Sequence, residues 1–183
     1  MFVPPSAEVR DLLALQLVSG VGPRLTAALL EHFGTAAAVL RADAAALRAV
    51  PGIGPKLAAN LAQARDGKAL ATELKLVERW HVRLVPLGSP DYPPALATIP
   101  DPPYLLYLRG TLTAADANAV ALVGSRHCSA YGRRVAVRLA AGLVRAGVTV
   151  VSGLPKGTGL HSTRSSRRWM QPPARTDFTR VLP

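Results

Sequence analysis

The chain has 183 residues, 49% of them hydrophobic, and carries 22 Lys and Arg against 11 Asp and Glu, a formal net charge of +11. Its single cysteine excludes an internal disulfide and a cysteine-rich zinc site, and its four scattered histidines lack metal-ligand spacing. This length allows one medium domain or two small ones, and the positive charge favours a polyanionic partner, nucleic acid before an acidic membrane surface.

The first residues and the apolar runs indicate the compartment. The N-terminus lacks the basic and apolar regions of a signal peptide, and no apolar run approaches the length of a membrane span. We therefore expect a cytoplasmic protein without membrane association, and we expect no cofactor and no bound metal.

Residues 6–70 are rich in alanine and poor in β-branched runs, which favours helices. Ser6 is suited to cap the first helix, which we expect to end before Gly20. A second helix is expected from about Arg24 to His32, with Gly34 as its C-cap.

A glycine-containing segment occurs twice in this region, 32 residues apart: Val18-Ser19-Gly20-Val21-Gly22-Pro23-Arg24-Leu25 and Val50-Pro51-Gly52-Ile53-Gly54-Pro55-Lys56-Leu57. Both segments resemble the helix-hairpin-helix motif. Glycines permit the tight turn, proline suits the first helical position, and the free N–H groups at the helix start, together with a cation, suit a DNA phosphate. The alternative is that these are only tight turns whose central Val21 and Ile53 fill a core. The candidate phosphate contacts are Gly20, Gly22, Arg24, Gly52, Gly54 and Lys56.

A connecting helix over residues 66–80 is expected to precede a strand at residues 82–87. A proline-rich stretch follows, from Asp91 to Pro103, which cannot continue a helix. Residues 105–110 then read as a short buried strand that ends in a turn.

The next elements form the pattern of one βαβ unit. Ala119–Gly124 is a continuous apolar run, typical of a parallel strand covered on both faces. A helix from Arg133 to Ala146 and a strand at Val148–Val151 follow, and a right-handed crossover is expected. On the helix, Val135, Leu139 and Leu143 share one side, widened by Ala136, Ala140 and Val144, while Arg134, Arg138 and Arg145 occupy the other.

Ligands of open α/β sheets bind beyond the carboxyl ends of the strands, near a helix N-terminus. Gly124-Ser125-Arg126 and Ser152-Gly153 fall there, although the chain has neither a GxGxxG fingerprint nor a P-loop. Small residues, two hydroxyls and a guanidinium suit a phosphate, which Arg126 is able to bind bidentately. The alternative for Arg126 is a salt bridge to a neighbouring carboxylate.

Two patterns in this part of the chain resemble the DNA-processing protein A (DprA/Smf) family. One is the succession Tyr92-Pro93-x-x-Leu96, Ile99-x-Asp101-Pro102-Pro103-x-x-Leu106-Tyr107-x-x-Gly110, which is similar to the family's lead-in segment and is expected to pack extra strands against the Rossmann-like core. The other is Val123-Gly124-Ser125-Arg126-x-x-Ser129-x-Tyr131-Gly132, followed by Val151-Ser152-Gly153-Leu154, which is similar to the family's core signature.

The resemblance implies a non-enzymatic protein that binds single-stranded DNA without sequence preference. Its implied setting is natural transformation (competence) and DNA recombination, with loading of a RecA-type recombinase and dimerisation through the Rossmann-like domain. The implied DNA-binding pocket consists of Gly124, Ser125, Arg126, Ser129, Ser152, Gly153 and Lys156.

The resemblance ends after Leu154. Residues 155–183 hold six basic side chains and one acidic one, with no helical or strand periodicity, so we expect a frameshift near this point or a basic disordered tail. The expected fold is α/β: a helical helix-hairpin-helix (SAM-like) module at 1–70, a linker helix at 71–80, an incomplete Rossmann-like domain at 81–157 and a tail at 158–183. Two parallel strands and one helix would leave apolar faces uncovered, so function and dimerisation are expected to be impaired.

Two other functions stay open at this point. One is a nucleotide-monophosphate hydrolase of the lysine-decarboxylase-like (LOG) type with a Rossmann-like core, although the PGGxGT loop of that group is absent. The other is a helix-hairpin-helix adaptor for duplex DNA, in which the βαβ part is only a scaffold.

Overall fold

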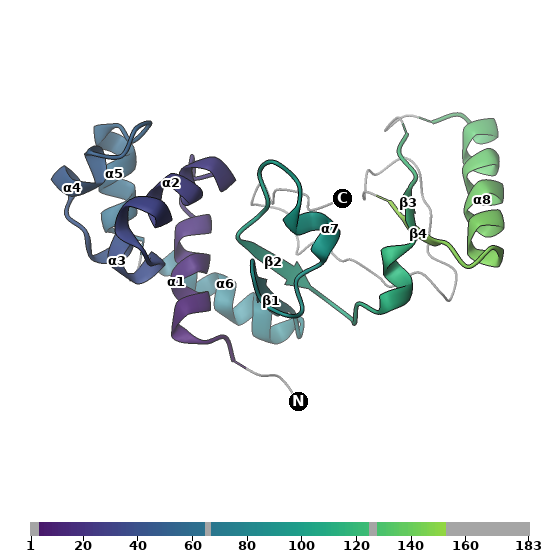
Figure 1. Cartoon of the computed structure of the whole chain (residues 1–183), viewed down its shortest axis with the longest axis horizontal. Helices are drawn as coiled ribbons and strands as arrows, with labels where there is room; N and C mark the ends of the chain where they lie inside the picture. Colours follow the sequence, from purple (N-terminus) through teal and green to yellow (C-terminus); the bar gives the residue numbers. More distant parts are fainter. Residues whose placement is uncertain (1–3, 65–66, 125–127, 153–183) are drawn as a thin grey trace. The chain divides into compact units, whose positions relative to one another are not determined.

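The computed structural model describes residues 4–64, 67–124 and 128–152, and it separates into two compact units (Figure 1). We call Met1–Leu108 the N-terminal unit and Arg109–Pro183 the C-terminal unit. The domain boundaries expected from the sequence, after residues 70, 80 and 157, stay predictions. Within the described ranges, no helix is both long enough and apolar enough to cross a membrane.

Short helices joined by tight turns begin the N-terminal unit. Side chains cap three of them: Ser6 Oγ accepts from the Val9 N–H at 3.3 Å, as expected, and Thr35 and Asp43 cap later helices in the same way. Gly34 ends the second helix with a φ of 81°, which confirms its expected role. The helices are α1 (Ala7–Gln16), α2 (Pro23–Phe33), α3 (Ala36–Arg41), α4 (Ala44–Arg48), α5 (Pro55–Ala62) and α6 (Lys68–Arg79).

One hydrophobic core joins these helices to a β-hairpin. Leu13 of α1, Leu29 of α2 and Leu61 of α5 are fully buried, and Leu105 of the hairpin belongs to the same cluster. Val21 and Ile53, the apolar residues between the paired glycines, are buried as well, as expected for core-filling side chains. The core cluster of the N-terminal unit therefore contains residues from both its first helix and its last strand.

The hairpin consists of β1 (Arg83–Pro86) and β2 (Leu105–Leu108), paired antiparallel, with α7 (Pro94–Ala97) in the long connection. The buried Tyr92 hydroxyl donates to the Pro103 carbonyl at 2.8 Å and closes the proline-rich segment on itself. Both strands contact α1, and Leu105 of β2 lies in the helical core. The expectation that these strands pack on the βαβ unit stays a prediction.

Glu73 of α6 is a charged residue inside this unit, only 6% exposed. Burial raises the pKa of its carboxyl group, and a hydrogen bond from the Tyr107 hydroxyl of β2 opposes that rise. Burial and the neighbouring carboxyl also raise the pKa of Tyr107. The folded state therefore binds the proton of Glu73 more tightly than the unfolded chain does.

This arrangement makes stability depend on pH. The unfolded chain releases the proton of Glu73 near the ordinary Glu value of about 4.3, while the folded chain retains it to higher pH, so stability falls as pH rises through that window. We expect Glu73→Gln to stabilise the unit at pH 7 and to raise its Tm, because the amide cannot ionise. Thermal unfolding followed at pH 4–7 checks this. The difference in Tm between the variant and the unmodified protein should disappear near pH 4. Glu78→Gln, at an exposed position of the same helix, serves as the control. A difference in Tm that does not change with pH would contradict a raised pKa of Glu73.

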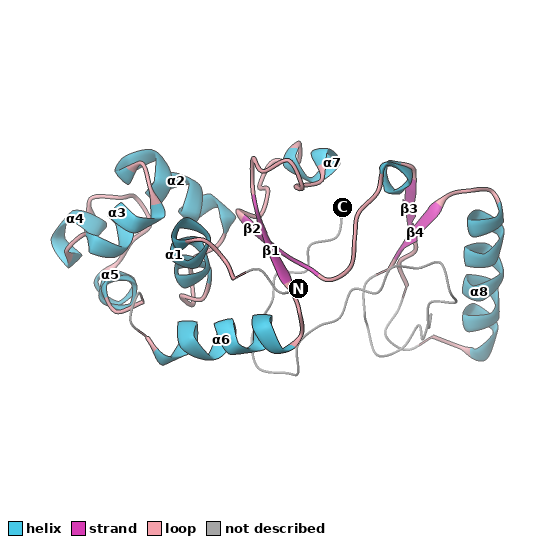
Figure 2. Cartoon of the chain, turned by 90° about the horizontal axis from the view of Figure 1, so that it is seen from below, coloured by secondary structure: helices cyan, strands magenta, loops and turns pink. Residues whose placement is uncertain are grey.

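The C-terminal unit contains the expected βαβ arrangement (Figure 2). β3 (Ala119–Ala121) pairs in parallel with β4 (Thr149–Val151), with Ala119 opposite Thr149, and α8 (Ala130–Arg145) connects them after the 3-10 helix η1 (Ala114–Ala117). The Thr149 hydroxyl donates to the Asp116 carboxylate of η1 at 3.2 Å. The order strand, loop, helix and parallel strand is confirmed, so the chain combines a helical module with a small α/β part.

Burial in this unit differs from that of a complete α/β sheet. β3 is exposed along its length, so the expectation that it is covered on both faces was wrong. No residue of α8 is fully buried, and Leu139, expected on its buried side, is 53% exposed. The reason is that, in the described part of the chain, β3 pairs only with β4, and α8 is the one α-helix that packs on this strand pair, beside the short η1. The expected uncovered apolar faces are confirmed.

Candidate nucleic-acid interface

The two glycine segments form the expected helical hairpins. Gly20 and Gly52 have φ values of +94° and +90°, a left-handed conformation that strains other residues. Gly22 and Gly54 are extended N-cap residues, each followed by proline at the first helical position. Neither α2 nor α5 has a side-chain cap, so both helix starts keep N–H donors for another partner.

The two hairpins also face each other within the N-terminal unit. A Cβ atom built on Gly20 would lie 3.7 Å from Leu57 Cδ1, and one built on Gly52 would lie 3.8 Å from Leu25 Cδ1. Leu25 and Leu57 occupy the same position in the two repeats. Each hairpin therefore touches the equivalent leucine of the other, and the repeats form one pseudosymmetric pair.

The cations of the two hairpins have different surroundings. Arg24 Nε donates to both carboxylate oxygens of Asp101, at 3.0 and 2.9 Å, and this hydrogen bond and the charge of Asp101 raise the pKa of the guanidinium. The Arg24 side chain stays 84% exposed. Lys56 is exposed and has no ion pair among the described residues. The expected phosphate contacts of both cations stay predictions, and Asp101 competes for one of them.

We expect Asp101→Asn to raise the affinity for DNA about threefold at low salt if Arg24 faces a phosphate, because the substitution removes a competing carboxylate. The dependence of affinity on salt should also steepen. Binding measured by fluorescence anisotropy checks this, with Asp91→Asn as the matched control, since Asp91 forms an exposed ion pair with Arg83 at 2.6 Å. Equal affinities of both variants would show that Arg24 makes no contact with DNA.

Only part of the expected phosphate pocket lies in the described chain. Gly124 follows β3 and Ser152 follows β4, so both lie at the carboxyl end of the parallel pair, where the sequence predicted the site. Ser129 is the N-cap of α8, and its Oγ accepts from the Gly132 N–H at 3.1 Å. Outside the described residues lie Ser125, Arg126, Gly153 and Lys156.

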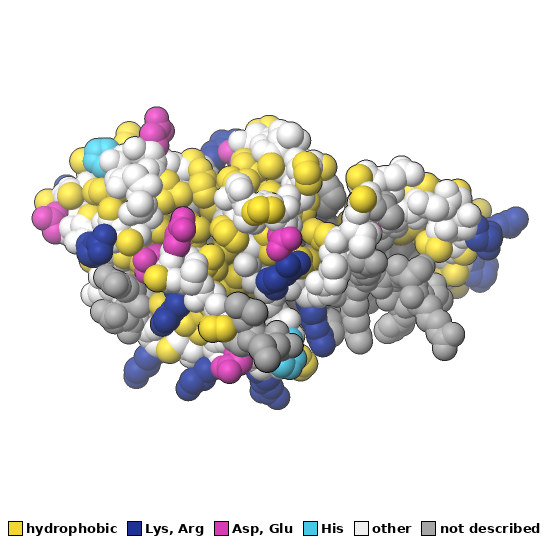
Figure 3. Space-filling model, turned by 60° about the horizontal axis from the view of Figure 1, so that its bottom comes forward, with side chains coloured by type: hydrophobic (Ala, Val, Ile, Leu, Met, Phe, Trp, Pro, Cys, Tyr) yellow, Lys and Arg dark blue, Asp and Glu magenta, His cyan; other side chains and the backbone are white. Residues whose placement is uncertain are grey.

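The two units differ in net charge. Residues 1–108 hold ten Lys and Arg against nine Asp and Glu, whereas residues 109–152 hold six Arg against one Asp. That one carboxylate, Asp116, already accepts hydrogen bonds from Thr113 and Thr149. Figure 3 shows dark-blue side chains gathered over α8. A polyanion is therefore attracted mainly to the C-terminal unit, a feature that the total charge of the chain does not reveal. The described residues hold no cluster of potential metal ligands.

Two family models match the chain. The model described as "DNA recombination-mediator protein A" matches residues 83–167, and the model described as "SAM-like Helix-hairpin-helix tandem" matches residues 10–65. The first match covers both strand pairs and extends beyond Leu154, where the sequence analysis placed the end of the resemblance. The second covers both hairpins.

Curated relatives match over the same regions. Protein Smf of Synechocystis sp. is 32% identical over 149 residues, 79% of this chain and 37% of that protein. Protein Smf of Escherichia coli is 37% identical over 90 residues, 49% of this chain and 24% of that protein. DNA processing protein DprA of Bacillus subtilis is 35% identical over 77 residues, 42% of this chain and 26% of that protein. The chain thus spans well under half the length of these relatives. It belongs to the DNA-processing protein A (DprA/Smf) family.

Proposed function

We propose that this protein binds single-stranded DNA through its phosphate backbone, without reading sequence, and acts in DNA processing. The observation that carries the proposal is the charge of the C-terminal unit, six Arg against one Asp in residues 109–152. Two of these arginines, Arg133 and Arg134, lie in the first turns of α8, where backbone N–H groups and the helix dipole favour an anion. Contacts of this kind position a strand and carry no sequence information.

Membership of the DprA/Smf family supports a finer proposal. Within it, the protein acts in the cytoplasm during natural transformation, passes single-stranded DNA to a RecA-type recombinase and dimerises through the Rossmann-like part, without catalysing a reaction. The pocket would consist of the seven residues named above, from Gly124 to Lys156, with Arg126 as its main cation.

Fluorescence anisotropy of a labelled single strand and of its duplex, at two salt concentrations, tests the proposal. We expect preference for the single strand, affinity that falls steeply with salt, and a loss in Arg126→Ala. Arg10→Ala, at an exposed position of α1, is the matched control and should bind as the unmodified protein does. Equal affinity for the single strand and the duplex, unchanged in Arg126→Ala, would mean that the protein binds DNA only through nonspecific charge. That result would contradict the proposal.

The helical hairpins support a second candidate, an adaptor for duplex DNA. The uncapped starts of α2 and α5 belong to one pseudosymmetric pair, an arrangement suited to two phosphates of a duplex backbone. The same anisotropy experiment separates the two functions. Preference for the duplex, lost in Arg24→Gln and Lys56→Gln but kept in Arg126→Ala, would favour the adaptor.

A further inference from the structure

Three arginines form a row along the outer side of α8. Arg134, Arg138 and Arg145 are all exposed, and their spacing of i, i+4 and i+11 places them within about 40° of one another around the helix. The row is about 16 Å long at the helical rise of ~1.5 Å per residue. We call these three residues and Tyr131 the α8 ridge.

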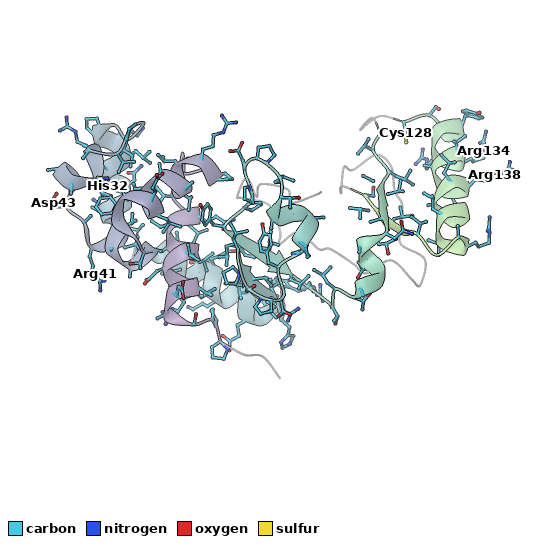
Figure 4. The ribbon with its side chains drawn as sticks, viewed as in Figure 1. His32, Arg41, Asp43, Cys128, Arg134 and Arg138 are labelled. Carbon is cyan, nitrogen blue, oxygen red and sulfur yellow. The ribbon has the colours of Figure 1, made fainter. Side chains whose placement is uncertain are left out.

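The ridge lies opposite the side of α8 that meets the strands. Ala136 and Leu143 are half-buried on that side, about half a turn away from the arginines, and the half-buried Val135 lies about 60–100° from them. Figure 4 shows Arg134 and Arg138 pointing away from β3 and β4. The exposed apolar residues Val137 and Val144 lie on one flank, and the exposed Leu139 lies next to Leu143, about 100–140° from the arginines, so covering these three residues would leave the ridge in water.

Tyr131 adds an aromatic ring to this row. Its side chain is 70% exposed, and it lies three residues before Arg134, on the same side of the helix. It also belongs to the first turn of α8, two residues after Ser129, a residue of the expected pocket. A large exposed aromatic ring beside guanidinium groups is the combination that stacks a base while the cations hold phosphates.

The charges of α8 are of one sign. The helix carries four arginines and no acidic residue, so no carboxylate of α8 neutralises the ridge. Like charges one turn apart destabilise a helix slightly, and an arginine row without acidic partners therefore favours an external anion. The fourth arginine, Arg133, lies about 100° away from Arg134 around the helix and is not part of the row.

We propose that the α8 ridge is a second contact surface for single-stranded DNA, which continues the strand from the expected pocket along the outer side of α8. Tyr131 stacks on a base next to the pocket, and Arg134, Arg138 and Arg145 bind successive stretches of the backbone. At ~3.4 Å per nucleotide of a stacked strand, the ridge accommodates up to about five nucleotides. This inference rests on the proposed function, because it extends the same binding site.

The test uses the full chain, a labelled oligothymidine and single variants whose fold is checked by circular dichroism. Arg134→Gln, Arg138→Gln and Arg145→Gln are each expected to weaken binding about threefold and to reduce the slope of log affinity against log salt by about 0.7. Arg133→Gln, on the same helix but off the ridge, should leave both values nearly unchanged. Tyr131→Ala is expected to weaken binding about tenfold, and Tyr131→Phe, which keeps the ring, should bind normally.

The outcomes separate this inference from the proposed function. If Arg133→Gln weakens binding as much as the ridge variants do, only total charge matters and the ridge is overturned, while single-strand binding stands. If Tyr131→Phe loses as much as Tyr131→Ala, base stacking is overturned. If the unmodified chain binds no single-stranded DNA, the proposed function and the ridge both fail.

Discussion

Replacing Leu13 with alanine is expected to reduce the free energy of unfolding of the N-terminal unit by about 2–5 kcal/mol, because the substitution leaves a cavity in a core that cannot fully collapse. Leu13 is fully buried where α1 meets the other helices and the β1–β2 hairpin. Since Leu105 of β2 belongs to the same core, the hairpin should lose stability together with the helices. Thermal unfolding by circular dichroism, with hydrogen exchange of the β2 amides, measures both effects.

Leu139→Ala is the matched control for this substitution. It makes the same change in a helix at a position that is 53% exposed, and it should alter stability by less than about 1 kcal/mol. Loss of helical stability in Leu13→Ala without faster exchange in β2 would show that the module and the hairpin fold separately. That result would favour the boundary near residue 70 that the sequence suggested.

The second large effect is expected in the C-terminal unit, whose amides should exchange far faster than those of α1. α8 buries no residue fully and β3 is exposed along its length, so little apolar contact opposes local opening. In α1, Leu13 and Leu15 are completely buried. A difference of about 3 kcal/mol in opening free energy would give exchange rates more than about 100-fold apart.

Hydrogen exchange followed by mass spectrometry on the full chain measures this difference. Peptides from residues 130–145 and from residues 7–16 serve as internal references for each other, since both segments are helical. Equal protection of the two helices would contradict the account and would mean that the apolar side of α8 is covered in solution.

Local signals predicted much of the fold. Ser6 and Gly34 bound helices as expected, because a capping hydroxyl and a left-handed glycine act within one turn of the chain. The paired glycines identified both hairpins for the same reason. The βαβ order followed from the apolar run before Gly124 and the glycine after α8, although β3 is shorter than the run of residues that suggested it.

Contacts between residues far apart in the chain could not be predicted from local patterns. An apolar strand pattern predicts that β2 is buried, but it does not predict that α1 covers it. The ion pair between Arg24 and Asp101 joins positions 77 residues apart, and neither residue carries a local signal for the other. Glu73 is likewise an ordinary helical residue in sequence, and only the tertiary fold buries it beside Tyr107.

The sequence predicted where the candidate site lies in the fold, but it identified only some of the residues proposed to form it. Gly124 and Ser152 lie where the strand order placed them. In the sequence, the periodicity of α8 places Arg134, Arg138 and Arg145 on the outer side of an amphipathic helix and gives them no further role. These arginines became candidates for DNA binding only when the charge was counted for each unit separately. That count needs the boundary after Leu108, which the structure provides.

Hydrogen exchange of the full chain, with and without a saturating oligothymidine, tests whether the C-terminal unit binds the single strand. We expect slower exchange at the start and along α8, residues 129–145, with little change in the hairpin segments at residues 20–26 and 52–58. Slower exchange confined to the hairpin segments, with α8 unaffected, would contradict single-strand binding by the C-terminal unit.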